Sequence, residues 1–89
     1  MRAVELRPDD GAIADSLGWV YFKQGRTADA VKALRRAVEL SPRDAVIREH
    51  LGDALSASGD AAGAREEWGK AAELDPKLES ARKKLEEAR

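Results

Sequence analysis

A spacing of 34 residues organises this chain, because sliding the sequence along itself by that distance aligns residue after residue. Positions 17, 18, 25, 28, 30, 37, 39, 40 and 42 match positions 51, 52, 59, 62, 64, 71, 73, 74 and 76. The same register reaches both ends, where positions 3, 5, 6, 8 and 10 match 37, 39, 40, 42 and 44. We therefore predict one domain over 1–89, made of the tail of a unit at 1–10, two full units at 11–44 and 45–78, and a C-terminal capping helix at 79–89.

The apolar residues inside each unit follow the period of an α-helix rather than that of a strand. Ala14, Leu17, Gly18 and Tyr21 occupy positions i, i+3, i+4 and i+7, which places them on one side of a helix. Further stripes follow in the rest of the two units, made by Ala30, Val31, Leu34, Ala37 and Val38, then Leu51, Leu55, Ala64, Trp68, Ala71 and Ala72. We expect an all-α chain of antiparallel helical hairpins in which these stripes are buried.

Glycine and proline mark the expected turns. Gly25 and Gly59 fall where the first helix of each hairpin must stop and reverse, a place that often requires a positive φ. Pro42 and Pro76 end the second helices, because proline disfavours the helical conformation in the residue before it. Small residues at positions 18, 30 and 37, and at 52, 64 and 71, let the paired helices approach closely.

These residues resemble the tetratricopeptide repeat (TPR) family over essentially the whole chain. The family's pattern is matched in the first unit by Leu17, Gly18, Tyr21, Gly25, Ala30, Leu34, Ala37 and Pro42, and in the second by Leu51, Gly52, Gly59, Ala64, Trp68, Ala71 and Pro76. Leu55 replaces the family's aromatic residue in the second unit, and Ala14 and Arg48 replace its leading Trp. The stretch 15–20 is also similar to the closing repeats of long bacterial members, so we interpret the chain as a fragment of a bacterial-type TPR protein.

The resemblance implies a right-handed superhelix, an α-solenoid, whose concave face is formed by the first helix of each hairpin and usually receives partner peptides. We nominate the residues of the first helices that fall outside the packing stripe: Asp15, Trp19, Phe22, Lys23, Glu49, Asp53 and Ser56. The predicted function is that of a protein-interaction scaffold that binds a protein or peptide on this face. The alternative is a structural assembly or capping segment of a longer TPR scaffold.

Two interpretations of the aromatic pair Trp19 and Phe22 remain open. Large aromatic side chains off the packing stripe are typical anchors of recognition surfaces. The same side chains equally suit packing against the helix of a neighbouring repeat. Asp15, Glu49 and Asp53 are expected either to give the groove an acidic side, which favours a basic peptide, or to form only a solvated helix face.

One well-known subgroup of the family grips the C-terminal carboxylate of chaperones with Lys and Asn side chains. The corresponding places here hold Asp15, Ser16, Trp19, Glu49, His50 and Asp53. Binding of a chaperone tail is therefore not predicted.

Charge and composition narrow the classes of partner. The formal net charge is -1, from 16 Lys and Arg against 17 Asp and Glu, so no long-range field draws in nucleic acid or anionic lipid. No apolar run approaches the length that spans a bilayer, and the opening residues lack the apolar stretch of a signal peptide. We expect a soluble chain with no nucleic-acid partner and no membrane insertion, while its compartment stays unknown.

The residues offer no pattern of catalytic or metal chemistry. The chain has no cysteine and a single histidine, His50, which is expected to be a partly buried helix residue beside Leu51. Glu49 and Asp53 lie near it in sequence, but one imidazole is weak support for a metal site. We predict no enzyme, no cofactor and no metal.

The two ends of the array differ in polarity. Residues 79–89 form a highly charged helix with a sparse stripe of Ala81, Leu85 and Ala88, which suits a cap. Residues 1–7 look like half a hairpin, in which Ala3, Val4 and Leu6 lack their usual cover. We expect that an upstream portion has been removed or that the chain covers this edge by self-association, as a homo-oligomer. The third alternative is a monomer whose first turn is frayed.

Overall fold

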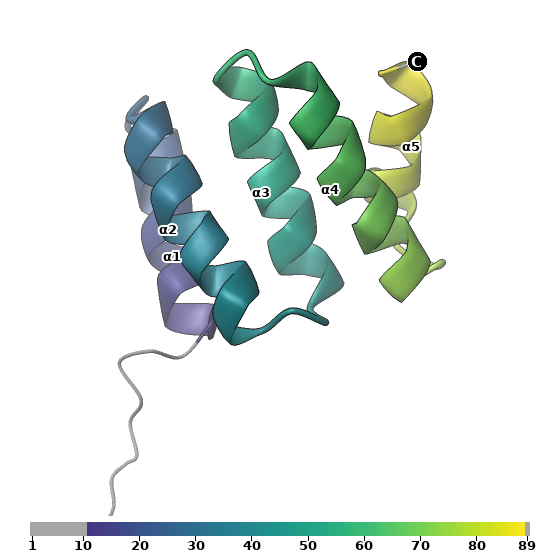
Figure 1. Ribbon diagram of the computed structural model, residues 1–89, viewed down its shortest axis with the longest axis horizontal. Helices are drawn as coiled ribbons and strands as arrows, with labels where there is room; N and C mark the ends of the chain where they lie inside the picture. The colour runs from purple at the N-terminus through teal and green to yellow at the C-terminus, as the bar shows by residue number, and fades with distance from the viewer. Residues whose placement is uncertain (1–10, 89) are drawn as a thin grey trace, which may run out of the picture.

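A computed structural model describes residues 11–88 as helices joined by short turns (Figure 1). The helices are α1 Gly11–Lys23, α2 Thr27–Leu40, α3 Ala45–Ala57, α4 Ala61–Leu74 and α5 Glu79–Glu87. Within residues 11–88 there is no strand. The expectation of an all-α chain is therefore confirmed, and each 34-residue unit contains two of the helices.

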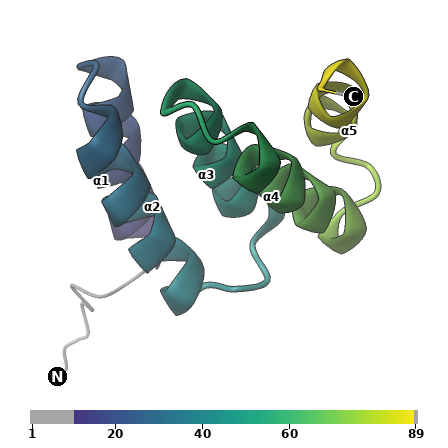
Figure 2. The same ribbon diagram turned by 45° about the horizontal axis from the view of Figure 1, so that its top comes forward.

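The helices form two antiparallel hairpins, α1 with α2 and α3 with α4, followed by the single helix α5. The hairpins stand side by side, with α2 against α3 and α4 against α5, and α1 also contacts α3 directly (Figures 1 and 2). Each hairpin thus covers a face of the next one along the chain. The fold is an all-α helical-repeat solenoid.

The turn inside each hairpin has the same hydrogen bonds and the same backbone conformation. After α1, the backbone N–H of Arg26 donates to Tyr21 O at 2.9 Å and that of Gly25 to Phe22 O at 3.0 Å. After α3, Asp60 and Gly59 repeat the two bonds to Leu55 O and Ser56 O, at 2.9 and 3.1 Å. Gly25 has a φ of 80° and Gly59 a φ of 95°, which confirms the predicted need for glycine.

The core lies between the two hairpins and under α4. Ala30, Leu34, Leu51, Ala54, Leu55, Ala64 and Trp68 form one buried cluster. The close approach within each hairpin occurs at a glycine: a Cβ on Gly18 would lie 2.6 Å from Leu34 Cγ, and one on Gly52 would lie 2.5 Å from Trp68 Cδ1. The predicted stripes of the second helices, and that of α3, are buried or half-buried as expected.

One residue of the predicted buried stripe is exposed. Leu17 was expected to pack with Ala14, Gly18 and Tyr21, but 47% of its surface is accessible. The main contacts of α1 within residues 11–88 are with α2 and α3, so the side of α1 that carries Leu17 has no described neighbour. The predicted unit tail at 1–10, with Ala3, Val4 and Leu6, lies outside the described residues.

We expect Gly52→Ala to lower the free energy of unfolding by about 1–3 kcal/mol, because the added methyl group forces the Trp68 ring away from α3. Gly69→Ala is the matched control, since Gly69 also lies inside a helix but nothing stands within 4 Å of its Cβ position. There the higher helix propensity of Ala should raise stability by up to about 1 kcal/mol. Urea unfolding followed by circular dichroism measures both changes, and equal effects would contradict the packing argument.

Candidate functional site

Side chains from α1, α3 and α5 meet on one face of the solenoid, which we call the first-helix face. Its α1 part is an aromatic stack in which Trp19 lies against Phe22, with ring centroids 5.0 Å apart and planes inclined by 14°. Trp19 also stacks on the ring of His50 from α3, at 4.5 Å and 26°. Lys23 Nζ lies 5.9 Å from the centre of the Trp19 ring. The stack therefore joins two successive repeats and retains a cationic edge.

An acid–base contact holds the α3 side of this stack in place. His50 Nδ1 lies 2.7 Å from Asp15 Oδ1, and both side chains are partly buried. Because a carboxylate oxygen accepts hydrogen bonds, the Nδ1 atom donates in this contact. The imidazole ring is thereby fixed against Trp19, which limits rotation of the indole.

The same contact recurs one repeat later, between α3 and α5. Lys84 Nζ donates to Glu49 Oε2 at 2.7 Å, and Glu49 and Lys84 are the residues 34 positions after Asp15 and His50. Glu49 is only 6% exposed and also accepts a hydrogen bond from Ser80 Oγ at 3.1 Å. A buried carboxylate needs such partners, since an unpaired charge in the interior is costly.

Asp53 extends the α3–α5 contact toward the core. Its carboxylate accepts from Lys84 Nζ at 3.1 Å and from the indole Nε1 of Trp68 at 3.1 Å. Burial disfavours the charge on Lys84, but the hydrogen bonds to Glu49 and Asp53 and their negative charges outweigh it, so the pKa of Lys84 is raised. One ammonium group thus compensates two carboxylates.

These contacts show where the nominated residues lie. The structure brings together around His50 the nominated residues of α1: Asp15, Trp19, Phe22 and Lys23. On α3, Glu49 and Asp53 both contact Lys84. Ser56 is exposed near the end of α3. The carboxylates of Asp15, Glu49 and Asp53, which could have given the groove an acidic side, each face a basic side chain. The sequence analysis did not predict that His50 and Lys84 pair with these carboxylates, although the 34-residue register relates one to the other.

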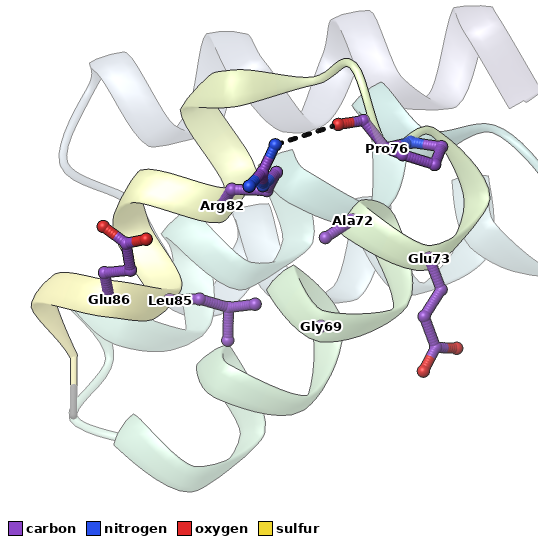
Figure 3. Close-up of a pocket in the computed structure, with 7 residues that line it drawn as sticks. All are labelled: Gly69, Ala72, Glu73, Pro76, Arg82, Leu85 and Glu86. Carbon is purple, nitrogen blue, oxygen red and sulfur yellow. Dashed lines mark hydrogen bonds between the residues drawn. The ribbon is translucent and has the colours of Figure 1, made fainter.

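A separate groove lies between α4 and α5, with a volume of about 490 Å³. Figure 3 shows Leu85 directed toward α4, near Ala72 and Gly69, while Glu86 points away from it. Arg82 crosses one end, where its Nη1 donates to Pro76 O at 3.5 Å. The first-helix face contributes none of the seven residues that line this groove.

Within residues 11–88, no group of three or more His, Cys, Asp or Glu side chains is placed to hold a metal ion. A search of the same part of the chain finds no helix with the length and apolar character needed to cross a membrane.

The repeated hairpins and contacts define a helical-repeat protein, and a comparison with sequence models of protein families identifies its family. The sequence model of the tetratricopeptide repeat matches residues 16–79. The chain therefore belongs to the tetratricopeptide repeat family, as its sequence pattern predicts.

Two known proteins are similar to this chain, one in sequence and one in both fold and sequence. The TPR repeat-containing protein PA4667 of Pseudomonas aeruginosa is 50% identical over 36 residues, which are 40% of this chain and 6% of that protein. A mutant O-GlcNAc transferase of Thermobaculum terrenum has a TM-score of 0.86 and 33% identity, over 91% of this chain and 16% of the transferase. The chain thus spans only a small part of either protein.

A third similarity concerns the fold alone. The first TPR of Spaghetti (RPAP3), solved with a bound HSP90 peptide, has a TM-score of 0.84 at 20% identity, over 94% of this chain and 68% of that one. Family membership and fold together support a protein-interaction module in general.

We expect Lys84→Met to lower the free energy of unfolding by about 1–2 kcal/mol, because it leaves Glu49 and Asp53 without their cation. The loss is smaller than for a fully buried pair, since Lys84 is 34% exposed. Lys83→Met is the control: Lys83 is exposed on the same helix, so a change within about 0.5 kcal/mol is expected.

The pH dependence of that difference gives a second check. A lysine with a raised folded-state pKa stabilises the fold fully below its unfolded value, about 10.4, and loses that contribution as the pH rises through the folded value. The stability gap between wild type and Lys84→Met should therefore persist at neutral pH and narrow above about pH 10.5. Urea titrations across the alkaline range measure it; a gap that stays constant or widens contradicts the pairing.

Proposed function

We propose that this chain is a non-catalytic protein-interaction module that binds a peptide or protein segment on the concave face of the repeat array, centred on Trp19. The observation that carries the proposal is the stack of Trp19 on Phe22 and His50. Trp19 is half-buried, so the stack is held by the protein and still presents part of its aromatic surface. A rigid, partly exposed aromatic side chain is a typical binding anchor, because little side-chain entropy is lost when a partner packs on it.

The charges around the stack favour a particular partner chemistry. Asp15 is engaged by His50, and Glu49 and Asp53 are engaged by Lys84, whereas Lys23 stands exposed beside the indole. We therefore propose an apolar or aromatic anchor residue flanked by an acidic group that reaches Lys23. This replaces the basic peptide that the acidic residues suggest when the sequence is considered alone.

Ser56 and the exposed end of α3 continue the same face beyond the aromatic stack. The proposal places the remainder of an extended peptide along α3, where backbone groups of the ligand meet polar side chains. Affinity then depends mainly on the contacts at Trp19, and the polar contacts orient the ligand.

We expect Trp19→Ala to weaken peptide binding by about tenfold or more, because the anchor loses its packing surface. Peptides selected by the wild-type protein from a displayed random library supply the ligands, and fluorescence anisotropy gives their dissociation constants. Val20→Ala is the matched control, since Val20 follows Trp19 on the same helix but lies on a different side.

Lys23→Ala tests the acidic flank separately. It should weaken the selected peptides that carry Asp or Glu beside the anchor and leave peptides without an acid unchanged. Selected peptides that bind Trp19→Ala as tightly as wild type would refute the proposed site.

A further inference from the structure

His50 enters the aromatic stack from α3 and is the only histidine of the chain. Its ring centroid lies 4.5 Å from that of Trp19, and its Nδ1 atom lies 2.7 Å from Asp15 Oδ1. A histidine side chain exchanges its second proton between about pH 5 and pH 8, a range in which Asp, Glu and Lys side chains ordinarily keep their charges. The stack therefore contains one group whose charge changes with pH near neutrality.

The contact with Asp15 determines which nitrogen of the His50 ring gains the proton. In the neutral ring one nitrogen carries a hydrogen, and here it is Nδ1, because Nδ1 donates to the Asp15 carboxylate. Nε2 is then the atom that is protonated as the pH falls. Within residues 11–88 it makes no hydrogen bond, and 23% of the side chain is accessible. Since a buried nitrogen without a partner is unfavourable, we expect Nε2 at the accessible edge of the ring, where its protonation adds a donor to the first-helix face.

Lys23 supplies the permanent positive charge of the same stack. Its Nζ atom lies 5.9 Å from the centre of the Trp19 ring, which the His50 ring also contacts. Both side chains therefore border the surface on which the proposed anchor residue packs. A ligand carboxylate beside the indole meets one cation while His50 is neutral and two cations once His50 is protonated.

The other charges around the His50 ring make this change matter. The charged side chains of the first-helix face that surround it are Asp15, Lys23, Glu49, Asp53 and Lys84. Three carboxylates against two lysines leave one net negative charge while the ring is neutral, and none once it is protonated. The proton thus removes the charge that repels an acidic ligand.

We propose, on the basis of the peptide site described above, that His50 determines which ligands bind there by taking up a proton. The protonated ring donates from Nε2 to an acidic group next to the anchor residue, and Lys23 adds its charge. Such a charge-assisted hydrogen bond is stronger than one between neutral groups. Ligands with an acid beside the anchor should therefore bind more tightly as the pH falls from about 8 to about 6, and ligands without one should not.

Fluorescence anisotropy at these two pH values tests the proposal with matched peptides. Each peptide selected by the wild-type protein that carries Asp or Glu beside the anchor is compared with its Asn or Gln counterpart. Wild type should bind the acidic peptide about threefold or more tightly at the lower pH and the amide peptide equally at both. His50→Phe keeps a flat ring next to Trp19 but has no nitrogen to protonate, so the gain should disappear. An equal gain in His50→Phe, or with the amide peptide, overturns the proposal.

The single histidine allows a second measurement that does not depend on affinity. The ring protons of His50 are the only histidine signals of the untagged chain, so NMR follows their pH titration with and without the acidic peptide. Because linkage is reciprocal, a ligand that prefers the protonated ring must hold the proton to higher pH. The midpoint of the titration should rise when the acidic peptide is bound. An unchanged or lower midpoint, or a ring that does not titrate between about pH 8 and pH 5, contradicts the proposed role.

The peptide site and the role of His50 fail in different experiments. If acidic peptides bind Trp19→Ala as tightly as wild type, the site itself is wrong and the inference about His50 falls with it. If Trp19→Ala weakens binding but wild type and His50→Phe share the same pH dependence, the site stands and only the role of His50 is refuted.

Discussion

The close approach of the two helices in each hairpin is the contact on which the rest of the structure depends. Leu34 packs directly over Gly18 and Trp68 over Gly52, at distances that leave no room for a Cβ atom. The second helix of the first hairpin packs closely against the first helix with one side. Its other side packs against the next hairpin, where α2 contacts α3. The successive first helices are thereby brought together, and side chains 35 positions apart, such as Asp15 and His50, come into hydrogen-bonding contact. The candidate site thus depends on the close packing of the helices at Gly18 and Gly52.

The acid–base contacts between successive first helices carry a second role, which is to hold the spacing of the repeats. The contact of Asp15 with His50 recurs one unit later as the contact of Glu49 with Lys84. Asp53 accepts hydrogen bonds from both Lys84 and the indole of Trp68, and so links this second contact to the core. A shift of one hairpin against the next would separate these carboxylates from their hydrogen-bond donors, which is costly above all for the buried Glu49. The electrostatic contacts therefore restrict the relative movement of the repeats, while the apolar core supplies most of the stability.

The sequence predicts the helices, their turns and most of the core, because these depend on local periodicity and on residues such as Gly25 and Gly59 whose backbone conformation is specific. It does not predict the environment of Leu17, since a repeat pattern reports the average neighbourhood of a position, and among the described residues no helix lies beside the side of α1 that carries Leu17. Nor does it show that Glu49 is buried: register places Glu49 and Lys84 on the same face, but only the side-chain distances reveal that they neutralise each other. The nomination of Trp19 and Phe22 follows from the sequence, whereas the support they receive from His50 requires the structure.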